Sequence, residues 1–518
     1  MEDSIFIGGG SEGYTEAQRL SLRYANRHGL IAGATGTGKT VTLQILAESF
    51  SKAGVPVILA DVKGDLSGLA KAGDGAQKLH GAFSERAAKI GFADYSYHDC
   101  PVTFWDLFGD QGHPVRTTVA EMGPLLLAQL LELSEAQEGI LNIAFRLADE
   151  EGLPLLDLKD LQSLLVWVGE NRQTLSLRYG NVSPASIGAI QRRLLVLENQ
   201  GGADLFGEPA LALGDLMRCD ALGQGMVNIL AADRLMASPK LYATFLLWLM
   251  SELFEELPEV GDPDKPKLVF FFDEAHLLFS GAPRALVEKI ERVARLIRSK
   301  GVGVYFVTQN PDDVADSVLA QLGNRVQHAL RAFTARDAQA LRRAAQTYRP
   351  NPRFDIADTI RDVGTGEALT SFLEARGNPG MAERTLIRPP SSRLGHIDAA
   401  TRARLIAASP LAGKYDTAID RDSAYERLKR RAEAAAEDAK KVEQAAETGR
   451  EFTAARRYDG GRHSPAQRIG GSTPARAPAA RRGDSVTDAF AKSFARQLGT
   501  RSGQAVARGI LGGLFKGR

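Results

Sequence analysis

The chain has 518 residues, of which 44% are hydrophobic and 25% charged, a composition typical of a soluble globular protein with more than one domain. No apolar run approaches the ~20 residues of a membrane-spanning helix. The acidic N-terminus lacks the basic-then-apolar order of a secretory signal, and the two cysteines form no disulfide or metal-binding pattern. These features predict a cytoplasmic protein without an integral membrane segment.

The charge is unevenly distributed along the chain. Residues 421–518 contain 21 Lys/Arg and 11 Asp/Glu, whereas the first 420 residues contain 43 and 52. A basic tail of this kind can contact nucleic acid, an acidic membrane or the protein's own body. The acidic body argues against a protein whose entire surface binds DNA.

Residues 1–111 alternate between β-rich and helical patterns. Apolar runs at 28–32 and 55–65 predict strands, a weaker run lies within 97–109, and a helix is expected to begin near Lys39. Strands separated by helices favour a mainly parallel sheet in an α/β fold.

Residues 112–200 carry apolar side chains at helical spacing and predict an inserted α-helical subdomain. The pattern breaks near Leu133 and Ser134. Asp157 is expected to cap one helix; Ser183, followed by Pro184 at the first helical position, is expected to cap another.

Strand–helix alternation returns in residues 201–390, the expected second part of the core. Strands are predicted at 225–233, 267–272, 302–309 and 324–333. Helices are predicted at 238–257, 282–299, 312–322 and 335–347. Residues 367–388 predict a closing hairpin.

The C-terminal part divides into three segments by composition. Residues 391–447 predict a helical extension, whose last helix lacks large apolar residues and is expected to be solvated. Residues 448–484 are rich in Gly, Pro, Ala and Arg, which is typical of a disordered linker. Residues 485–518 place apolar residues one helical turn apart and predict an amphipathic docking helix.

The stretch GATGTGKT fits the phosphate-binding pattern G-x-x-x-x-G-K-[ST], between a predicted strand and a predicted helix. Its glycines let backbone N–H groups point at phosphate oxygens, and the helix N-terminus adds partial positive charge. Lys39 can reach the β- and γ-phosphates, and the Thr40 hydroxyl can bind Mg²⁺. The predicted nucleotide-binding residues are Gly33, Ala34, Thr35, Gly36, Thr37, Gly38, Lys39 and Thr40.

Asp273 and Glu274 follow an apolar strand, at the end where open α/β sheets bind ligands. Asp273 is expected to hold the Mg²⁺ shell, through water, and Glu274 to act as general base on the attacking water. The adjacent second carboxylate favours ATP hydrolysis over phosphoryl transfer to a substrate hydroxyl. Lys39 and Asp273 lie 234 positions apart, much of it occupied by the helical insert.

Gln309 ends the next predicted strand, where its amide could contact the γ-phosphate or the attacking water; a loop-capping role is the alternative. An arginine commonly stabilises the transferred phosphoryl group, often from a neighbouring subunit. The candidates are Arg298, Arg325 and Arg331. The stretch DVKGD (61–65) could contact Mg²⁺ or water, or form a simple Asp/Gly turn; the sequence leaves both open.

The ordered series GATGTGKT, DVKGD, FFFDEAHLLF, SKGVGVYFVTQNP and QLGNRVQHALR resembles the HerA-like branch of the HerA/FtsK ATPases. The chain is most similar to the bacterial YjgR-type proteins, described as HerA-like helicases. The resemblance spans most of the chain and is weakest in 448–484. It implies a RecA-like P-loop core, ATP with Mg²⁺, and a hexameric ring with nucleotide at the subunit interfaces.

Carried over by position, Lys39 and Thr40 match the Walker A pair, Asp273 and Glu274 the Walker B pair, and Gln309 the strand-end glutamine. Two departures from the family pattern matter. Arg298 matches an arginine that acts across the interface, but Ile297 stands where the family motif has glycine. The family's N-terminal β-barrel, which contacts a nuclease, does not fit in the 27 or so residues before the first predicted strand, so no nuclease partner is expected.

The sequence therefore predicts an oligomeric, Mg²⁺-dependent ATPase that translocates on DNA. The alternative from another class is an ATP-dependent assembly switch that binds a protein or membrane partner through its basic tail. A third possibility is that the tail folds onto a neighbouring subunit and stabilises a ring.

Overall fold

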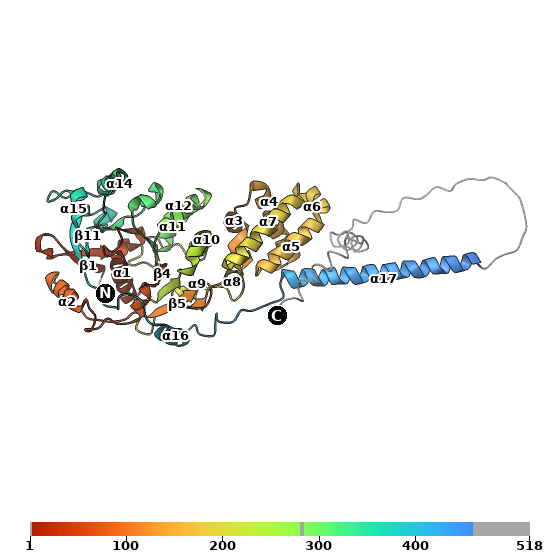
Figure 1. Cartoon of the computed structure of the whole chain (residues 1–518), viewed down its shortest axis with the longest axis horizontal. Helices are drawn as coiled ribbons and strands as arrows, with labels where there is room; N and C mark the ends of the chain where they lie inside the picture. The colour runs from red at the N-terminus through yellow and green to blue at the C-terminus, as the bar shows by residue number, and fades with distance from the viewer. Residues whose placement is uncertain (1–2, 280–283, 459–518) are drawn as a thin grey trace, which may run out of the picture. The chain divides into compact units, whose positions relative to one another are not determined.

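The computed structural model describes residues 3–279 and 284–458 (Figure 1). The chain divides into two compact units. The sheet unit comprises Met1–Leu133 and Leu195–Asp420, and the helical unit comprises Ser134–Leu194 and the chain from Arg421 on. The predicted docking helix (485–518) and most of the predicted linker lie outside the described residues. Within the described residues, no helix combines the length and apolar content needed to cross a membrane.

One sheet of twelve strands forms the centre of the sheet unit, in the order β2-β1-β12-β11-β10-β3-β9-β8-β4-β7-β5-β6. Its strands are β1 (Ser4–Gly10), β2 (Glu16–Ser21), β3 (Gly29–Ala32), β4 (Val57–Asp61), β5 (Val102–Asp106), β6 (His113–Pro114), β7 (Val227–Ala231), β8 (Leu268–Phe272), β9 (Val302–Thr308), β10 (Asn324–Gln327), β11 (Glu367–Ser371) and β12 (Glu383–Ile387). The strands from β10 to β6 are parallel, and the remaining pairs are antiparallel. The predicted mainly parallel α/β fold is confirmed.

The register aligns the carboxyl ends of the central strands. Ala32 pairs with both Thr308 and Gln327, Phe272 pairs with Phe306, and Ala60 pairs with Phe272. The loops that follow β10, β3, β9, β8 and β4 consequently leave the sheet along one edge.

The sheet is larger than the sequence patterns predicted. β1 and β2 precede the first predicted strand and extend the sheet beyond the closing hairpin, because β1 pairs with β12. Three glycines in β1 (Gly8–Gly10) obscure its strand pattern, yet the space is needed: a Cβ at Gly8 would lie 2.1 Å from the carbonyl oxygen of Leu386.

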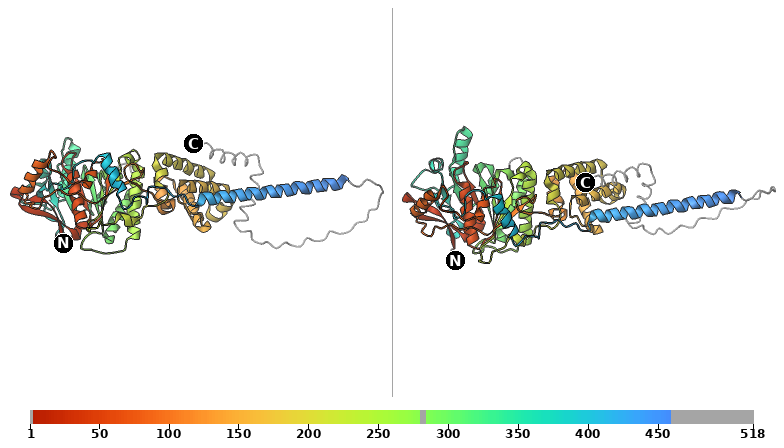
Figure 2. Two further views of the ribbon diagram at one scale, coloured as in Figure 1. Left: turned by 90° about the horizontal axis from the view of Figure 1, so that it is seen from below. Right: turned by 60° about the horizontal axis from the view of Figure 1, so that its bottom comes forward.

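Helices flank the sheet (Figure 2). Those of the sheet unit are α1 (Lys39–Lys52), α2 (His80–Lys89), α3 (Val119–Leu130), α8 (Ala203–Leu205), α9 (Leu213–Leu216), α10 (Pro239–Glu256), α11 (His276–Phe279), α12 (Arg284–Ile297), α13 (Asp316–Leu319), α14 (Ala335–Gln346), α15 (Ile356–Asp362) and α16 (Ala399–Ala407). α1 buries Leu43, Ile45, Leu46 and Phe50 in the core that also contains Phe271 and Tyr305 of the sheet.

A buried polar network binds α1 to the segment that directly follows β12. Arg388 donates to the carbonyl oxygen of Ile45 at 2.9 Å and to Glu48 Oε2 at 3.3 Å. The Glu48 carboxylate also accepts from the backbone N–H groups of Ser391 and Ser392. The Arg388 and Glu48 side chains are both buried, and each neutralises the charge of the other. Hydrogen bonds therefore hold the helix that begins at Lys39 in addition to apolar packing.

Two predicted elements differ from the structure. The helix predicted at 312–322 is reduced to the single turn of α13, because residues 308–313 form a local turn. In this turn Asn310 accepts from the backbone of Asp312 at 3.2 Å, and Asp313 accepts from Thr308 Oγ1 at 2.8 Å. The strand predicted at 324–333 ends at Gln327. Beyond it, the carbonyl oxygen of Ala329 accepts from Ala34 of the phosphate-binding loop.

The helical unit contains α4 (Glu135–Glu151), α5 (Leu158–Glu170), α6 (Arg172–Tyr179), α7 (Pro184–Leu197, which passes its boundary) and α17 (Ala424–Tyr458). Asp157 caps α5, and Ser183 accepts from the backbone N–H of Ser186 at the start of α7, as predicted. α17 continues past position 447, so the predicted linker does not begin at 448.

Candidate nucleotide-binding site

The candidate site residues lie together at the carboxyl ends of four neighbouring strands of the sheet. The loop Gly33–Thr40 follows β3, Asp273 and Glu274 follow β8, and Gln309 follows β9. β4 lies on the other side of β8 and adds Asp61 and Lys63. Because parallel strands end at a common edge, residues up to 276 positions apart in sequence come together there.

The backbone of the loop 33–40 has the conformation that a phosphate-binding loop requires. Gly33, Gly36 and Gly38 have φ values of 154°, 77° and 118°, in the region that favours glycine. α1 begins at Lys39, directly after them. Thr35 and Gly36 are exposed at the tip, so the N–H groups of the loop face an accessible space in front of a helix N-terminus.

Lys39 folds back over its own loop. Its ammonium group donates to the carbonyl oxygens of Gly33 at 2.6 Å and Ala34 at 3.0 Å, and the side chain is buried. Burial, and then the positive charge of Lys63, lower the pKa of Lys39, while Glu274 and Asp273 act in the opposite direction. These mutual effects show that the two lysines and two carboxylates share one electrostatic environment.

The loop is supported from β10 and β11 as well as from β3. Ala34 donates to the carbonyl oxygen of Ala329 at 2.8 Å, and Gly366 donates to that of Thr37 at 3.1 Å. The buried His328 ring bridges Thr42 of α1, at 2.8 Å, and the carbonyl oxygen of Glu367, at 2.9 Å. Burial lowers the pKa of His328 to about 4, so this bridge is uncharged at neutral pH.

The carboxylate pair is buried at the end of β8. Asp273 Oδ1 accepts from the backbone N–H of Glu274 at 2.9 Å, and burial raises the pKa of Asp273 to about 7 despite the opposing charge of Lys63. Glu274 has φ 47°, a left-handed conformation that costs about 1–2 kcal/mol in a residue other than glycine. Strain of this kind is characteristic of functional positions.

Three side chains surround the Glu274 carboxylate. Lys63 forms an ion pair with Oε1, while His276 approaches Oε2 at 3.2 Å and Gln309 donates to it at 3.3 Å. Burial acts to raise the pKa of Glu274, but the bond and charge of Lys63 outweigh it and lower that pKa overall. Glu274 is therefore an ionised carboxylate with an exposed amide, Gln309, beside it.

Asp61 forms the turn that was one of the two interpretations of DVKGD; contact of this stretch with Mg²⁺ or water stays a prediction. Its carboxylate accepts from the backbone N–H groups of Gly64 at 2.8 Å and Leu66 at 3.1 Å. The turn points Lys63 at Glu274. The stretch thus contributes to the site through its lysine, which the sequence analysis did not single out; its position between the two acids of a strand-end motif was the available signal.

The three arginine candidates lie in different places. Arg298 precedes β9 and lies at the amino ends of the strands, roughly 20 Å from the site along a seven-residue strand. Arg325 is the second residue of the short strand β10 and lies opposite Leu30 of β3. Arg298 pairs with Asp262 at 3.4 Å, and Arg325 donates to the carbonyl oxygens of Leu322 and Leu319. Arg331 is exposed just after Ala329, on the edge that carries the loop.

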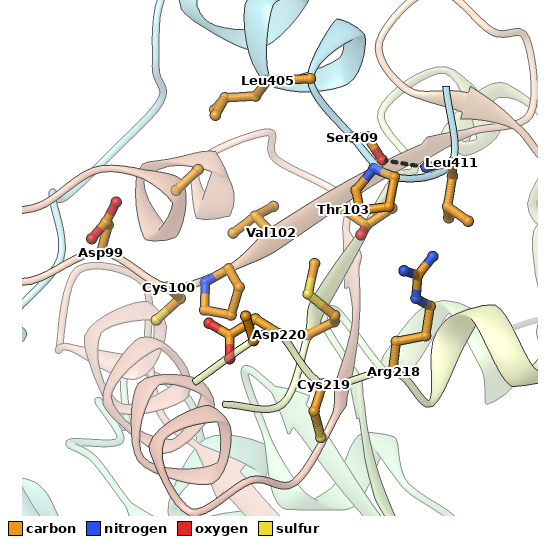
Figure 3. Close-up of a pocket in the computed structure, with 16 residues that line it drawn as sticks. Asp99, Cys100, Val102, Thr103, Arg218, Cys219, Asp220, Leu405, Ser409 and Leu411 are labelled. Carbon is orange, nitrogen blue, oxygen red and sulfur yellow. Dashed lines mark hydrogen bonds between the residues drawn. The ribbon is translucent and has the colours of Figure 1, made fainter. Parts of the chain in front are cut away.

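A cavity of 440 Å³ is separate from this site (Figure 3). It lies at the amino ends of β5 and β7, where Val102 and Met226 line it, and Leu405 of α16 covers one side. Both cysteines, Cys100 and Cys219, are free thiols and line this cavity. The site chemistry is at the other edge of the sheet, so the cavity is not the nucleotide site.

The residues present fit a nucleoside triphosphate with Mg²⁺. Asp61, Asp273 and Glu274 concentrate negative charge in a buried region, and the raised pKa values of Asp61 (about 6) and Asp273 (about 7) reflect the cost of burying these acids. A hydroxyl at Thr40 and a carboxylate at Asp273 are the hard oxygen ligands that Mg²⁺ takes alongside water and phosphate. No cluster of three or more His, Cys, Asp or Glu within the described residues forms a protein-only metal site.

The fold and this site define the chain as a P-loop ATPase. Residues 10–518 match the family described as "Helicase HerA-like C-terminal", and the chain belongs to that family. The predicted HerA/FtsK-type assignment is confirmed.

A curated relative agrees with this placement. The "DNA double-strand break repair helicase HerA" of Sulfolobus acidocaldarius is 21% identical over 355 residues, which cover 68% of this chain and 63% of that protein. The chain thus spans about 63% of the length of this relative.

Among solved structures, the bacterial conjugative coupling protein TrwBdeltaN70 in its unbound monoclinic form has a TM-score of 0.50 at 14% identity. The match covers 77% of this chain and 91% of that chain. VirB4 of Thermoanaerobacter pseudethanolicus has a TM-score of 0.48 at 14% identity, over 75% and 97% of the two chains. The likeness to TrwBdeltaN70 concerns the fold.

Proposed function

We propose that the chain is a Mg²⁺-dependent ATP hydrolase that assembles into a ring and moves along DNA. The observation that carries the hydrolase part is the meeting of Lys39, Glu274 and Gln309 at one sheet edge. The motor part is supported by the family and by the name of the HerA relative.

Each residue has a defined task in this proposal. The N–H groups of the loop 33–40 and the Lys39 ammonium hold the β- and γ-phosphates, and Thr40 and Asp273 hold Mg²⁺, which neutralises charge on the phosphates. Glu274 accepts a proton from the attacking water, which Gln309 orients. Lys39 must leave the carbonyl oxygens of Gly33 and Ala34 to reach the phosphates.

The stabilising arginine comes from a second copy of the chain in this proposal. Arg298 lies at the opposite sheet edge from its own loop, so it can act only on a neighbour's nucleotide. Arg325 is bound to backbone carbonyl groups within its own subunit, which disfavours the same role. A ring with nucleotide between subunits satisfies this requirement.

Glu274→Gln tests the hydrolase. The amide keeps the size of the side chain but accepts no proton, so ATP turnover is expected to fall at least about 100-fold while ATP still binds. Steady-state phosphate release and equilibrium binding of a fluorescent ATP analogue measure the two properties. An exposed acid of the same type, Glu85→Gln in α2, serves as the control. Undiminished turnover in Glu274→Gln would remove the general-base assignment.

A further inference from the structure

Helix α14 belongs to the sheet unit (Figure 1), and the side chains on its exposed side are cationic. Its buried residues Leu341 and Ala344 pack in a small apolar cluster with Ile360 of α15 and Leu369 of β11. The opposite side is exposed and carries arginine and glutamine but no carboxylate: Arg336, Gln339, Arg342, Arg343 and Gln346.

The arginines of this face form few ion pairs. Asp337, the acid of α14, accepts from the backbone N–H groups of Thr334 and Phe333 and so caps the helix. Among the ion pairs of the described residues, Arg343 binds Asp312, whereas none includes Arg336 or Arg342. Arg336 contributes, after the hydrogen bonds of the helix cap, to lowering the pKa of Asp337. Exposed arginines outside ion pairs are notable in a body whose first 420 residues carry more acids than bases.

An exposed aromatic side chain precedes α14. Phe333 is 83% exposed, and it comes directly before Thr334, the N-cap of α14. An exposed phenyl ring at the start of a helix that carries exposed arginines offers a platform on which an unpaired base can stack, and the arginines of the same helix can bind phosphates.

Helix α14 and the chain that leads into it are bonded to the nucleotide site at two points. The chain that leads into α14 passes Ala329, which accepts from Ala34 of the phosphate-binding loop at 2.8 Å. Arg343 forms an ion pair with Asp312. The next residue, Asp313, accepts from Thr308 Oγ1 at 2.8 Å, and Thr308 directly precedes Gln309. A change at either loop would therefore be transmitted to α14.

We propose that Phe333, Arg336 and Arg342, here named the α14 face, bind single-stranded DNA; this inference rests on the proposed function and names its contact surface. The arginines bind phosphates, and Phe333 stacks on a base. A second copy of the chain is the alternative occupant of this face, and the assembly state measured in the test below distinguishes it from DNA.

The test compares two variants of the full chain with a control that removes the same charge elsewhere. Arg336→Gln/Arg342→Gln removes the phosphate contacts, Phe333→Ala removes the platform, and Lys52→Gln/Arg404→Gln neutralises two exposed cations on α1 and α16. Affinity for a fluorescent oligothymidine and for a duplex of equal length is measured by anisotropy across a salt series, and the assembly state by light scattering.

The arginine variant is expected to bind oligothymidine at least about tenfold more weakly, with a salt slope shallower by about 1.4, since each phosphate contact contributes about 0.7 for single strands. Phe333→Ala is expected to lose about tenfold affinity for oligothymidine with its slope and its duplex affinity unchanged. The control is expected to bind as the unchanged protein does.

The remaining outcomes overturn the inference in distinguishable ways. If the unchanged protein binds DNA and both variants match the control, the α14 face is not the contact surface, and the proposed function stands. If the variants change the assembly state but not DNA affinity, the face belongs to a second copy of the chain. If the unchanged protein binds no DNA at any salt, the inference and the motor proposal both fail.

Discussion

Lys63 is the residue that compensates the buried acids of the site. Its ammonium pairs with Glu274, and the carboxylates of Glu274 and Asp273 raise the pKa of Lys63 against the effect of burial. The Glu274 side chain is nearly inaccessible, so removing its cation leaves a charge without adequate solvation. The pair therefore stabilises the protein before any nucleotide is bound.

Lys63→Met is expected to lower the free energy of unfolding by about 1–2 kcal/mol, a value reduced because the Lys63 side chain is 42% exposed. Thermal unfolding measures the change, and Lys71→Met, at an exposed lysine on the same loop region, is the control. Equal melting temperatures for both variants would show that Lys63 contributes nothing to stability.

His28 makes folding sensitive to acid. Its ring accepts from the backbone N–H of Val304 at 3.0 Å, contacts the carbonyl oxygen of Ala294 at 2.6 Å, and is fully buried. Burial lowers the pKa of His28 from 6.5 to about 4. The unfolded chain therefore binds a proton between these values while the folded chain does not, so this contribution to stability is complete above pH 6.5 and is lost as pH falls toward 4.

His28→Asn isolates this contribution from that of the buried acids, which act in the opposite direction. Asparagine tolerates the φ of 57° at this position. Relative to the variant, the unchanged protein should lose about 3 kcal/mol of unfolding free energy between pH 7 and pH 4, measured by urea denaturation. The exposed His396→Asn is the control, and a pH-independent difference for His28→Asn would contradict the assignment.

At the scale of elements, local patterns were sufficient wherever an element was continuous and strongly apolar. β8 and β9 are buried over their whole length, and the loop between β3 and α1 has an unambiguous signature. The patterns failed where tertiary bonds decide. Glycine-rich β1 is a strand because it pairs with β12, and residues 308–313 turn because their side chains bond each other.

The site residues likewise divide into those that sequence patterns predict and those that tertiary contacts place. The order of motifs was enough to predict that Lys39, Glu274 and Gln309 belong together, because strand ends of a parallel sheet converge. Lys63 lies in the DVKGD stretch, but only the turn directs it toward Glu274; His328 carries no sequence signal, since burial against α1 fixes it. Neither arrangement leaves a periodic signal in the sequence.

Asp160 joins α5 to the start of α17 within the helical unit. This fully buried carboxylate accepts from the backbone N–H groups of Leu156, Asp157 and Tyr425 and from the Ser423 hydroxyl. Asp160→Asn replaces an acceptor oxygen by a donor and opposes two of these bonds, which should cost about 2–3 kcal/mol. In Asp160→Asn, backbone hydrogen exchange should accelerate at residues 424–431. The control, Asp149→Asn at an exposed position of α4, should leave this exchange rate unchanged. Unaltered exchange in Asp160→Asn would contradict this anchoring role.

At the scale of the whole molecule, the nucleotide site at the carboxyl ends of the strands and the cationic helix α14 are connected, because two loops of the site are bonded to that helix or to the chain that leads into it. The basic composition of residues 421–518 supports the alternative of an assembly switch that binds a protein or membrane partner. Removal of residues 459–518 separates the two: a motor keeps its response to DNA, whereas a switch loses its partner.

The rate of ATP hydrolysis by the full chain in Mg²⁺, measured with and without single-stranded and duplex DNA, tests the central claim most directly. We expect DNA to raise turnover severalfold, the increase to decline with salt as phosphate contacts are screened, and Glu274→Gln to abolish turnover in every condition. Turnover that is the same with and without either DNA, in a protein that hydrolyses ATP through Glu274, would contradict the motor and leave the assembly switch.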